Sequence, residues 1–347
     1  MKKTINSTAE LARHLGLSRW AVSRAINGHS GVSAETVGLV QSAMQEFGFT
    51  PSAHARGLRG RRTGAIGICF RQLNTPITTE KIAHVQRLLS RRGYRPLFEL
   101  TEVDAGMGVE VINHFISMRV EGVLLIDAPP GAESTNWLKM LKRHNIPAAL
   151  LEPRSPATAN AVQLDREDAL ARVTERLLTL GHTHFGLLGI SREFPLGKPR
   201  YDGIARALSA RGLDIERCAD IIDIPGHRHL GMRYGRELGG KLIDKKKRPT
   251  ALIALNDEVA AGAMWYLQKL GCNFPADFSL FGFDNLVLSE QTSPALCTVD
   301  HNVEASALAA VEMLVKLIEL GDPSAKLPVV RIEPRLIFRE SIARVHS

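Results

Sequence analysis

The chain has 347 residues, of which 44% are hydrophobic and 23% charged, the balance of an ordinary globular protein. No apolar run approaches the roughly 18–20 residues that cross a bilayer, and the amino terminus lacks the apolar stretch of a secretory signal. The four cysteines are far apart and form no CxxC pair. We therefore expect a cytoplasmic protein with reduced thiols, no metal, no cofactor and no membrane partner.

The net charge of +8 is unevenly distributed. Residues 1–62 hold nine Lys or Arg and three Glu, so six of the eight net positive charges lie in less than a fifth of the chain. This asymmetry indicates a nucleic-acid-binding end on a nearly neutral body. Charge alone leaves open a solvated basic arm without a partner.

Residues 1–48 have the pattern of three short helices. Ser7 and Glu10 have capping-box spacing, Gly16 ends the first helix, and Ser18 and Ser33 can cap the next two. Two short helices joined by a glycine-containing turn predict a helix-turn-helix, whose second helix enters the major groove of DNA. The apolar positions at helical spacing are Leu11, Ala12, Leu15, Ala21, Val22, Ala25, Ile26, Val37, Val40, Met44 and Phe47.

The second of these helices, over about residues 19–27, carries the candidate base contacts. Arg19 and Arg24 can offer paired donors to guanine O6 and N7. Trp20 can pack on a thymine methyl or the sugar-phosphate wall, or can be a buried anchor between helices. The short polar side chains Ser18, Ser23 and Asn27 suit phosphates, and Ser18 suits helix capping as well.

From about Thr63, apolar β-like runs alternate with amphipathic helices, which predicts parallel sheets covered by helices. Two such stretches suggest two similar lobes. The expected strands are 65–70, 95–100, 122–127, 148–152, 161–164, 184–190, 220–224, 251–255 and 279–284. The expected helices are 79–92, 109–118, 134–144, 165–180, 199–210, 230–243 and 257–270.

Polar residues follow the predicted strands, at the edge where open parallel sheets bind ligands. They are Arg71, Asp127, Glu152, Asn256, Asp257 and Asp284. Two lobes with such edges facing each other would form a cleft that closes on a small polar molecule.

Three runs resemble the lac repressor (LacI/GalR) family: Glu10–Asn27 (ELARHLGLSRWAVSRAIN), Gly31–Thr36 and Phe49–Leu58. The resemblance extends over essentially the whole chain. It implies a small all-α helix-turn-helix head (1–48), a hinge helix (49–62) and a periplasmic-binding-protein-like α/β body of two parallel-sheet lobes (63–347). The first lobe would comprise about 63–163 and 300–328, and the second about 164–299 and 329–347.

The resemblance further implies that the chain crosses between the lobes near Leu164, Asp300 and Val329. Little sequence follows Ser341, and it contains no heptad pattern for a tetramer. We therefore expect a homodimer.

In this family the hinge becomes a helix on operator DNA, and its leucine wedges into the minor groove. Leu58 matches that leucine, Ala55 lies one turn earlier, and Arg56 is among the basic residues around them. An apolar wedge unstacks a base step and bends the duplex, and the added contacts offset the cost. Simple packing of Leu58 against the body is the alternative.

The resemblance also identifies candidate effector contacts. Arg200 matches the family's effector-contacting arginine, Asn256 its asparagine and Asp284 its aspartate. Arg200 and Asp284 could grip adjacent hydroxyls of a sugar as donor and acceptor. The alternatives are a structural ion pair for these two, and helix capping for Asn256 and for Asp257.

Two positions depart from the family pattern. Glu152 stands where an Asp or Asn often lies, and the loop that begins at Arg71 lacks the aromatic residue that many relatives stack on the effector. Arg71 could instead face an acidic group. The expected effector is a sugar first, and a sugar acid or phosphate second.

The sequence thus predicts a sequence-specific DNA-binding regulator, a repressor of transcription, that binds pseudo-palindromic double-stranded operator DNA. No GxSxG, P-loop or metal-ligand spacing indicates an enzyme, and we interpret the pair His182 and His184 as structural. The alternative is a cytoplasmic sugar-binding or enzymatic α/β protein with an incidental helical head.

Overall fold

The computed structural model describes residues 5, 7–26, 28, 30–49, 62–71, 75–101, 107–129, 131–226, 231–245 and 247–345. The chain divides into two units, Met1–Thr63 and Gly64–Ser347. Within the described residues, no helix is both long and apolar enough to cross a membrane.

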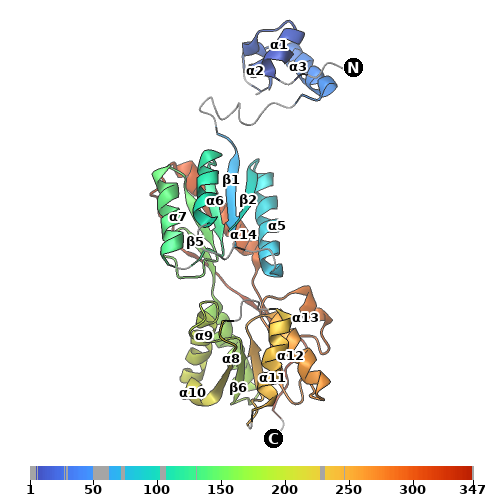
Figure 1. Cartoon of the computed structure of the whole chain (residues 1–347), viewed down its shortest axis with the longest axis vertical. Helices are drawn as coiled ribbons and strands as arrows, with labels where there is room; N and C mark the ends of the chain where they lie inside the picture. Colours follow the sequence, from blue (N-terminus) through green and yellow to red (C-terminus); the bar gives the residue numbers. More distant parts are fainter. Residues whose placement is uncertain are drawn as a thin grey trace. The chain divides into compact units, whose positions relative to one another are not determined.

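The first unit contains three helices, α1 (Thr8–His14), α2 (Arg19–Ile26) and α3 (Ala34–Phe47) (Figure 1). The Ser7 side chain accepts a hydrogen bond from the backbone N–H of Glu10, and Ser33 accepts one from Thr36. These bonds satisfy N–H groups that a helix start leaves unpaired. The predicted helix starts are confirmed. The side chains of the small core are Ile5, Leu11, Ala12, Val22, Ala25, Val40, Ala43 and Phe49.

The second unit begins with a six-stranded parallel sheet that forms the first lobe. Each strand lies close to a predicted apolar run, because runs of Ile, Leu and Val bury both faces of a parallel strand. The strands in spatial order are β11 (Val330–Ile332), β5 (Ala161–Leu164), β4 (Ala148–Leu151), β3 (Gly122–Ile126), β1 (Ala65–Phe70) and β2 (Arg95–Leu100).

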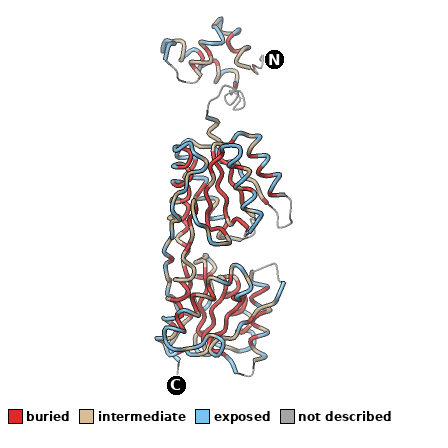
Figure 2. Tube along the Cα trace, turned by 90° about the vertical axis from the view of Figure 1, so that its left-hand side faces the viewer, coloured by how far each residue is buried: buried red, intermediate tan, exposed pale blue. Residues whose placement is uncertain are grey.

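Helices cover both faces of this sheet. Alternate side chains of β1 and β3 pack on α5 (Pro76–Arg91) and α14 (Val303–Leu320). The side chains between them pack on α6 (Met107–Ser117) and α7 (Ala132–Arg143). Figure 2 shows the strands buried and the exposed residues on the outer helix surfaces.

The second lobe is built on a four-stranded parallel sheet with the order β7 (Ala219–Ile222), β6 (Phe185–Leu188), β8 (Ala251–Ala254) and β9 (Ser279–Phe281). One face packs on α8 (Arg166–Thr179) and α9 (Lys198–Ala210). The other face packs on α11 (Met232–Ile243) and α12 (Asp257–Lys269). The short helices α10 (Ile215–Cys218) and α13 (Val287–Gln291) follow α9 and β9 in the chain. The expected two-lobed α/β body is confirmed.

Three segments connect the lobes (Figure 1). The first joins β5 to α8, and the second joins β10 (Thr298–Asp300) to α14, as the sequence predicts. The third was expected near Val329, and this position is wrong by a few residues. Strand β11 still pairs with β5 of the first sheet, and the chain then pairs with β10 as β12 (Arg335–Ile337). The crossing therefore falls at Glu333–Pro334, because the apolar side chains of β11 extend the first sheet by one edge strand.

Candidate functional site

Helix α2 presents an exposed polar face in the head. The Ser18 side chain accepts a hydrogen bond of 3.0 Å from the N–H of Ala21, so it caps α2. Arg19 is exposed. Trp20 is 59% exposed, which excludes the alternative of a buried anchor between the helices. Ser23 lies half-buried one turn after Arg19.

Arg24 is held within the head. Its Nε donates to the carbonyl oxygen of Ser30 at 2.7 Å, and its Nη2 donates to the same oxygen. The guanidinium carbon lies 4.8 Å from the centre of the Trp20 ring. Arg24 thus has a local structural role that the sequence did not predict, whereas Arg19 has no described hydrogen bond or ion pair. The candidates Asn27, Ala55, Arg56 and Leu58 lie outside the described residues.

Three acidic residues follow strands of the body in an unusual backbone conformation. Asp127 follows β3, Glu152 follows β4 and Asp284 lies beyond β9, with φ angles of 52°, 53° and 116°. Residues with side chains rarely adopt positive φ, and such strain gathers at functional sites. These carboxylates belong to a group of six charged residues, which we name the interlobe charge cluster: Lys81, Asp127, Glu152, Arg166, Asp284 and His301.

Glu152 is the centre of the interlobe charge cluster. Its fully buried carboxylate accepts a hydrogen bond from Arg166 and lies 3.8 Å from Lys81 Nζ and 3.7 Å from His301 Nδ1. Burial acts to raise the pKa of this carboxyl, but the cations around it, Arg166 first, hold the pKa well below its ordinary value. Glu152 is therefore ionised and joins the first sheet to α8 of the second lobe.

His301 connects the carboxylates of the two lobes. Its Nε2 lies 2.8 Å from Asp284 Oδ1, and its ring packs edge-on against Phe283. Burial acts to lower the pKa of His301, but its hydrogen bond to Asp284 and the negative charges of Asp284 and Glu152 outweigh burial and raise the pKa. The imidazolium form is thus favoured between these two acids.

Arg200 lies at the start of α9, next to the interlobe charge cluster. Gly203 allows this position, because a Cβ there would lie 2.1 Å from the carbonyl oxygen of Glu167 on α8. Arg200 is 5% exposed, donates to the Leu196 carbonyl at 2.7 Å and lies 4.2 Å from the Phe283 ring centre. Burial, and then the charge of Arg166, lowers the pKa of Arg200 to about 9. A ligand anion would counter both effects.

Asn256 and Asp257 begin α12. The Asn256 side chain accepts from the N–H of Val259 at 2.8 Å, so the capping alternative holds for this residue. Asp257 is fully buried and accepts from Thr298 Oγ1 at 2.6 Å and from the Leu286 N–H at 2.8 Å. These bonds give Asp257 a structural role. Whether Asn256 also contacts an effector stays a prediction.

Sequence reasoning missed Lys81, Arg154, Arg166 and His301. His301 directly follows β10, so the rule that selected the other strand ends could have found it. Lys81 lies on the buried face of α5 with Thr78 and Val85, and a lysine at helical spacing among inward residues is itself a signal.

Arg71, which was predicted, follows β1 and is partly buried. Burial lowers the pKa of Arg154, and the negative charge of Asp127 opposes this shift. The positive charges of Arg71 and Arg166 lower the pKa of Arg154 further. Arg71 therefore lies close enough to Arg154 to act on it.

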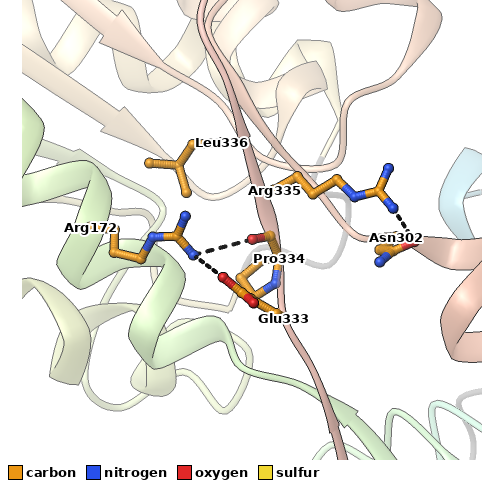
Figure 3. A pocket seen from close by; sticks show the side chains of 6 residues that line it. All are labelled: Arg172, Asn302, Glu333, Pro334, Arg335 and Leu336. Atoms are coloured by element: carbon orange, nitrogen blue, oxygen red, sulfur yellow. Dashed lines mark hydrogen bonds and ion pairs between the residues drawn. The ribbon is translucent and has the colours of Figure 1, made fainter.

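A separate open pocket of about 380 Å³ lies along the crossing segments (Figure 3). Within it, Arg172 donates to Glu333 and to the Pro334 carbonyl, and Arg335 donates to Asn302. These groups pair with one another, and none of the residues that line the pocket is a predicted effector contact. In the part of the chain that the structure describes, no cluster of His, Cys, Asp or Glu could hold a metal ion.

Comparison with known proteins agrees with this arrangement. Residues 8–52 match the family described as bacterial regulatory proteins, lacI family, and residues 174–342 match the periplasmic binding protein-like domain. The transcriptional regulator DegA of Bacillus subtilis (strain 168) is 27% identical over 348 residues and covers 100% of both chains. The transcriptional repressor PurR of Pasteurella multocida (strain Pm70) is 28% identical over 341 residues and covers 98% of both. The lac repressor dimer bound to operator and the anti-inducer ONPF has a TM-score of 0.86 and 22% identity, covering 98% of this chain and 100% of that one.

The helix-turn-helix head and the two-lobed body therefore define a DNA-binding transcription regulator. These relatives are named as regulators of transcription and not as enzymes. The chain belongs to the lac repressor (LacI/GalR) family.

Proposed function

We propose that the protein is a sequence-specific repressor that binds a pseudo-palindromic operator as a homodimer. Its operator affinity is controlled by a small polar effector, a sugar or sugar derivative, bound between the two lobes. The matched lac repressor structure, a dimer with operator and a small anti-inducer, supports this proposal by analogy of fold.

One observation carries the effector part of the proposal: buried and half-buried charged groups from both lobes meet in the interlobe charge cluster. Glu152 comes from the first lobe, Arg166 and Asp284 come from the second, and His301 lies on a crossing segment. A ligand that displaces or completes these contacts changes the free energy of lobe closure. Arg200 and Asp284 are the proposed direct contacts with the effector. Glu152 is proposed to influence effector binding indirectly, by holding the cations around it in place.

The DNA-binding part of the proposal rests on the exposed face of α2. Arg19 and Trp20 are exposed on one face of α2, where they could enter a groove of DNA. Val22 and Ala25 pack the opposite face into the core of the head. A base-reading helix needs this division between an anchored and an open face. The proposed wedge, Leu58, falls outside the described residues and rests on the family resemblance.

Selection of duplexes from a random library by the full chain tests this function. We expect enrichment of one motif with two inverted half-sites, because a twofold dimer presents two α2 helices. With Arg19→Ala, the preference at one position in each half-site should relax. A library without an enriched motif would favour the alternative, an α/β sugar-binding or enzymatic protein with an incidental head.

A further inference from the structure

Three arginines beside the interlobe charge cluster form no ion pair with a described carboxylate. Lys81, Arg166 and His301 each form an ion pair within the cluster. No ion pair with a described residue is formed by Arg71, Arg154 or Arg200. The three therefore add positive charge to a site whose own charges are already paired.

The unpaired arginines are also short of hydrogen-bond acceptors. The buried Nε atoms of Arg154 and Arg200 have no partner among the described residues, nor has that of Arg166. Arg200 is 5% exposed. A buried cationic donor without an acceptor is costly, so each such group marks a place where an acceptor from outside the chain would stabilise the fold.

These arginines come from both lobes and lie around Arg166 of the interlobe charge cluster. The charges of Arg71 and Arg166 reach Arg154, and the charge of Arg166 reaches Arg200. Arg71 and Arg154 follow strands β1 and β4 of the first lobe, while Arg200 lies on α9 of the second. An anion among them would relieve repulsion and hold both lobes at once.

The effector must supply hydrogen-bond acceptors for the unpaired arginine donors and negative charge to offset the repulsion between the arginines. A neutral sugar supplies only the acceptors. Its hydroxyl oxygens accept hydrogen bonds but add no negative charge to that of the nearby carboxylates, which by themselves leave the pKa of Arg154 and of Arg200 lowered. The planar guanidinium fork fits the two oxygens of a carboxylate or a phosphate, and such charged bonds are stronger than neutral ones. Asp284 remains as an acceptor for hydroxyl groups on the same ligand.

We propose that the effector carries an anionic group, a carboxylate or a phosphate, which Arg71, Arg154 and Arg200 bind. It is thus a hydroxylated acid or a phosphate ester and not a neutral sugar. This inference rests on the proposed interlobe effector site and narrows the class of molecule that occupies it.

The test is a thermal-shift titration of the full chain at constant ionic strength with glucose, gluconate and glucose 6-phosphate, with ribose and ribose 5-phosphate, and with inorganic phosphate. We expect at least one anion to raise Tm by about 2 °C or more, in proportion to the logarithm of its concentration, and its neutral counterpart to raise Tm less. Gluconate and the phosphate esters distinguish a carboxylate site from a phosphate site.

Variants locate the anion. Arg200→Gln and Arg71→Gln should each weaken anion binding about tenfold or more, because each removes a charged hydrogen bond. Arg211→Gln, at an exposed position directly after α9, is the matched control and should leave anion binding unchanged. Arg71 is partly exposed, so its variant decides the matter if Arg200→Gln does not fold by circular dichroism.

Three results would overturn the inference: neutral sugars as effective as their acids, an anion effect that survives in both variants, or no effect of any anion, phosphate included. The first of these leaves the interlobe effector site in place and refutes only its anionic character. Failure of the proposed function would appear separately, as loss of motif enrichment in the DNA selection.

Discussion

At the scale of single residues, the two candidate base-reading arginines differ in what else they do. Arg19 is exposed, whereas Arg24 donates twice to the Ser30 carbonyl and packs on Trp20. We expect Arg19→Ala to cost about 1–3 kcal/mol of operator affinity at one base position and to leave the stability of the head unchanged.

Arg24→Ala should lower both the operator affinity and the stability of the head, because it also removes the hydrogen bonds to Ser30 in the turn before α3. Fluorescence anisotropy measures the affinity, and a thermal melt of the full chain measures the stability. Equal melts for the two variants would refute the structural role of Arg24.

His301 should make stability depend on pH. Its pKa in the folded protein is raised, so its contribution is complete below the unfolded value of about 6.5 and is lost as pH rises through the folded pKa. His301→Gln should therefore destabilise the body by about 3 kcal/mol near pH 6, and by less near pH 9, where a larger share of wild-type molecules has a neutral imidazole and has lost the same interaction.

Denaturant unfolding at the two pH values measures this difference. His144→Gln, at an exposed position, is the matched control and should show no such dependence. A cost of His301→Gln that is the same at both pH values would mean that the imidazolium does not join the two carboxylates.

At the scale of elements, close helix packing in the second lobe depends on particular glycines. A Cβ at Gly235 of α11 would lie 2.1 Å from the Val259 carbonyl oxygen of α12, a contact that real side chains do not make. At Gly240 of the same helix, the nearest atom would be 3.7 Å away.

We therefore expect Gly235→Ala to destabilise the body by about 1–3 kcal/mol, because α11 and α12 must separate. Gly240→Ala should be neutral or stabilising by up to about 1 kcal/mol, since alanine favours a helix. Urea unfolding of both variants tests this, and an equal effect would show that helix propensity outweighs packing.

Local patterns predicted most elements of this fold. The caps at Ser7, Ser18 and Ser33 lie close in sequence to the N–H groups they bind, so spacing reveals them. Apolar runs likewise reveal the strands, because the signal lies within a few consecutive residues. The boundary at β11 was missed because a three-residue edge strand is decided by pairing with β5 and not by its own pattern.

The candidate site was only partly predictable. The acids at the strand ends could be found because topology brings those ends together. The partners of Glu152 come from α5, α8 and the β10–α14 segment, and no sequence spacing connects them. Tertiary packing alone determines that Lys81 and Arg166 lie beside the same carboxylate.

At the scale of the whole molecule, the uneven charge predicts how DNA binding responds to salt. The head and hinge of each chain, residues 1–62, carry six of its eight net positive charges, so a dimer brings two such segments to one duplex. If it neutralises about 6–10 phosphates, affinity should fall about 10³–10⁵-fold between 50 and 200 mM salt. Anisotropy titrations at several salt concentrations measure the slope. A nearly flat dependence would contradict phosphate binding by the basic head.

The central claim is that the interlobe site and the DNA-binding head are coupled. The most direct measurement is the affinity of the full chain for its selected duplex, with and without a saturating amount of the compound that most stabilises the body in the thermal-shift titration. The coupling model predicts a change of about 5–150-fold, and an equal change in the affinity for that compound when the duplex is present. An operator affinity that is the same with and without the bound compound would contradict it.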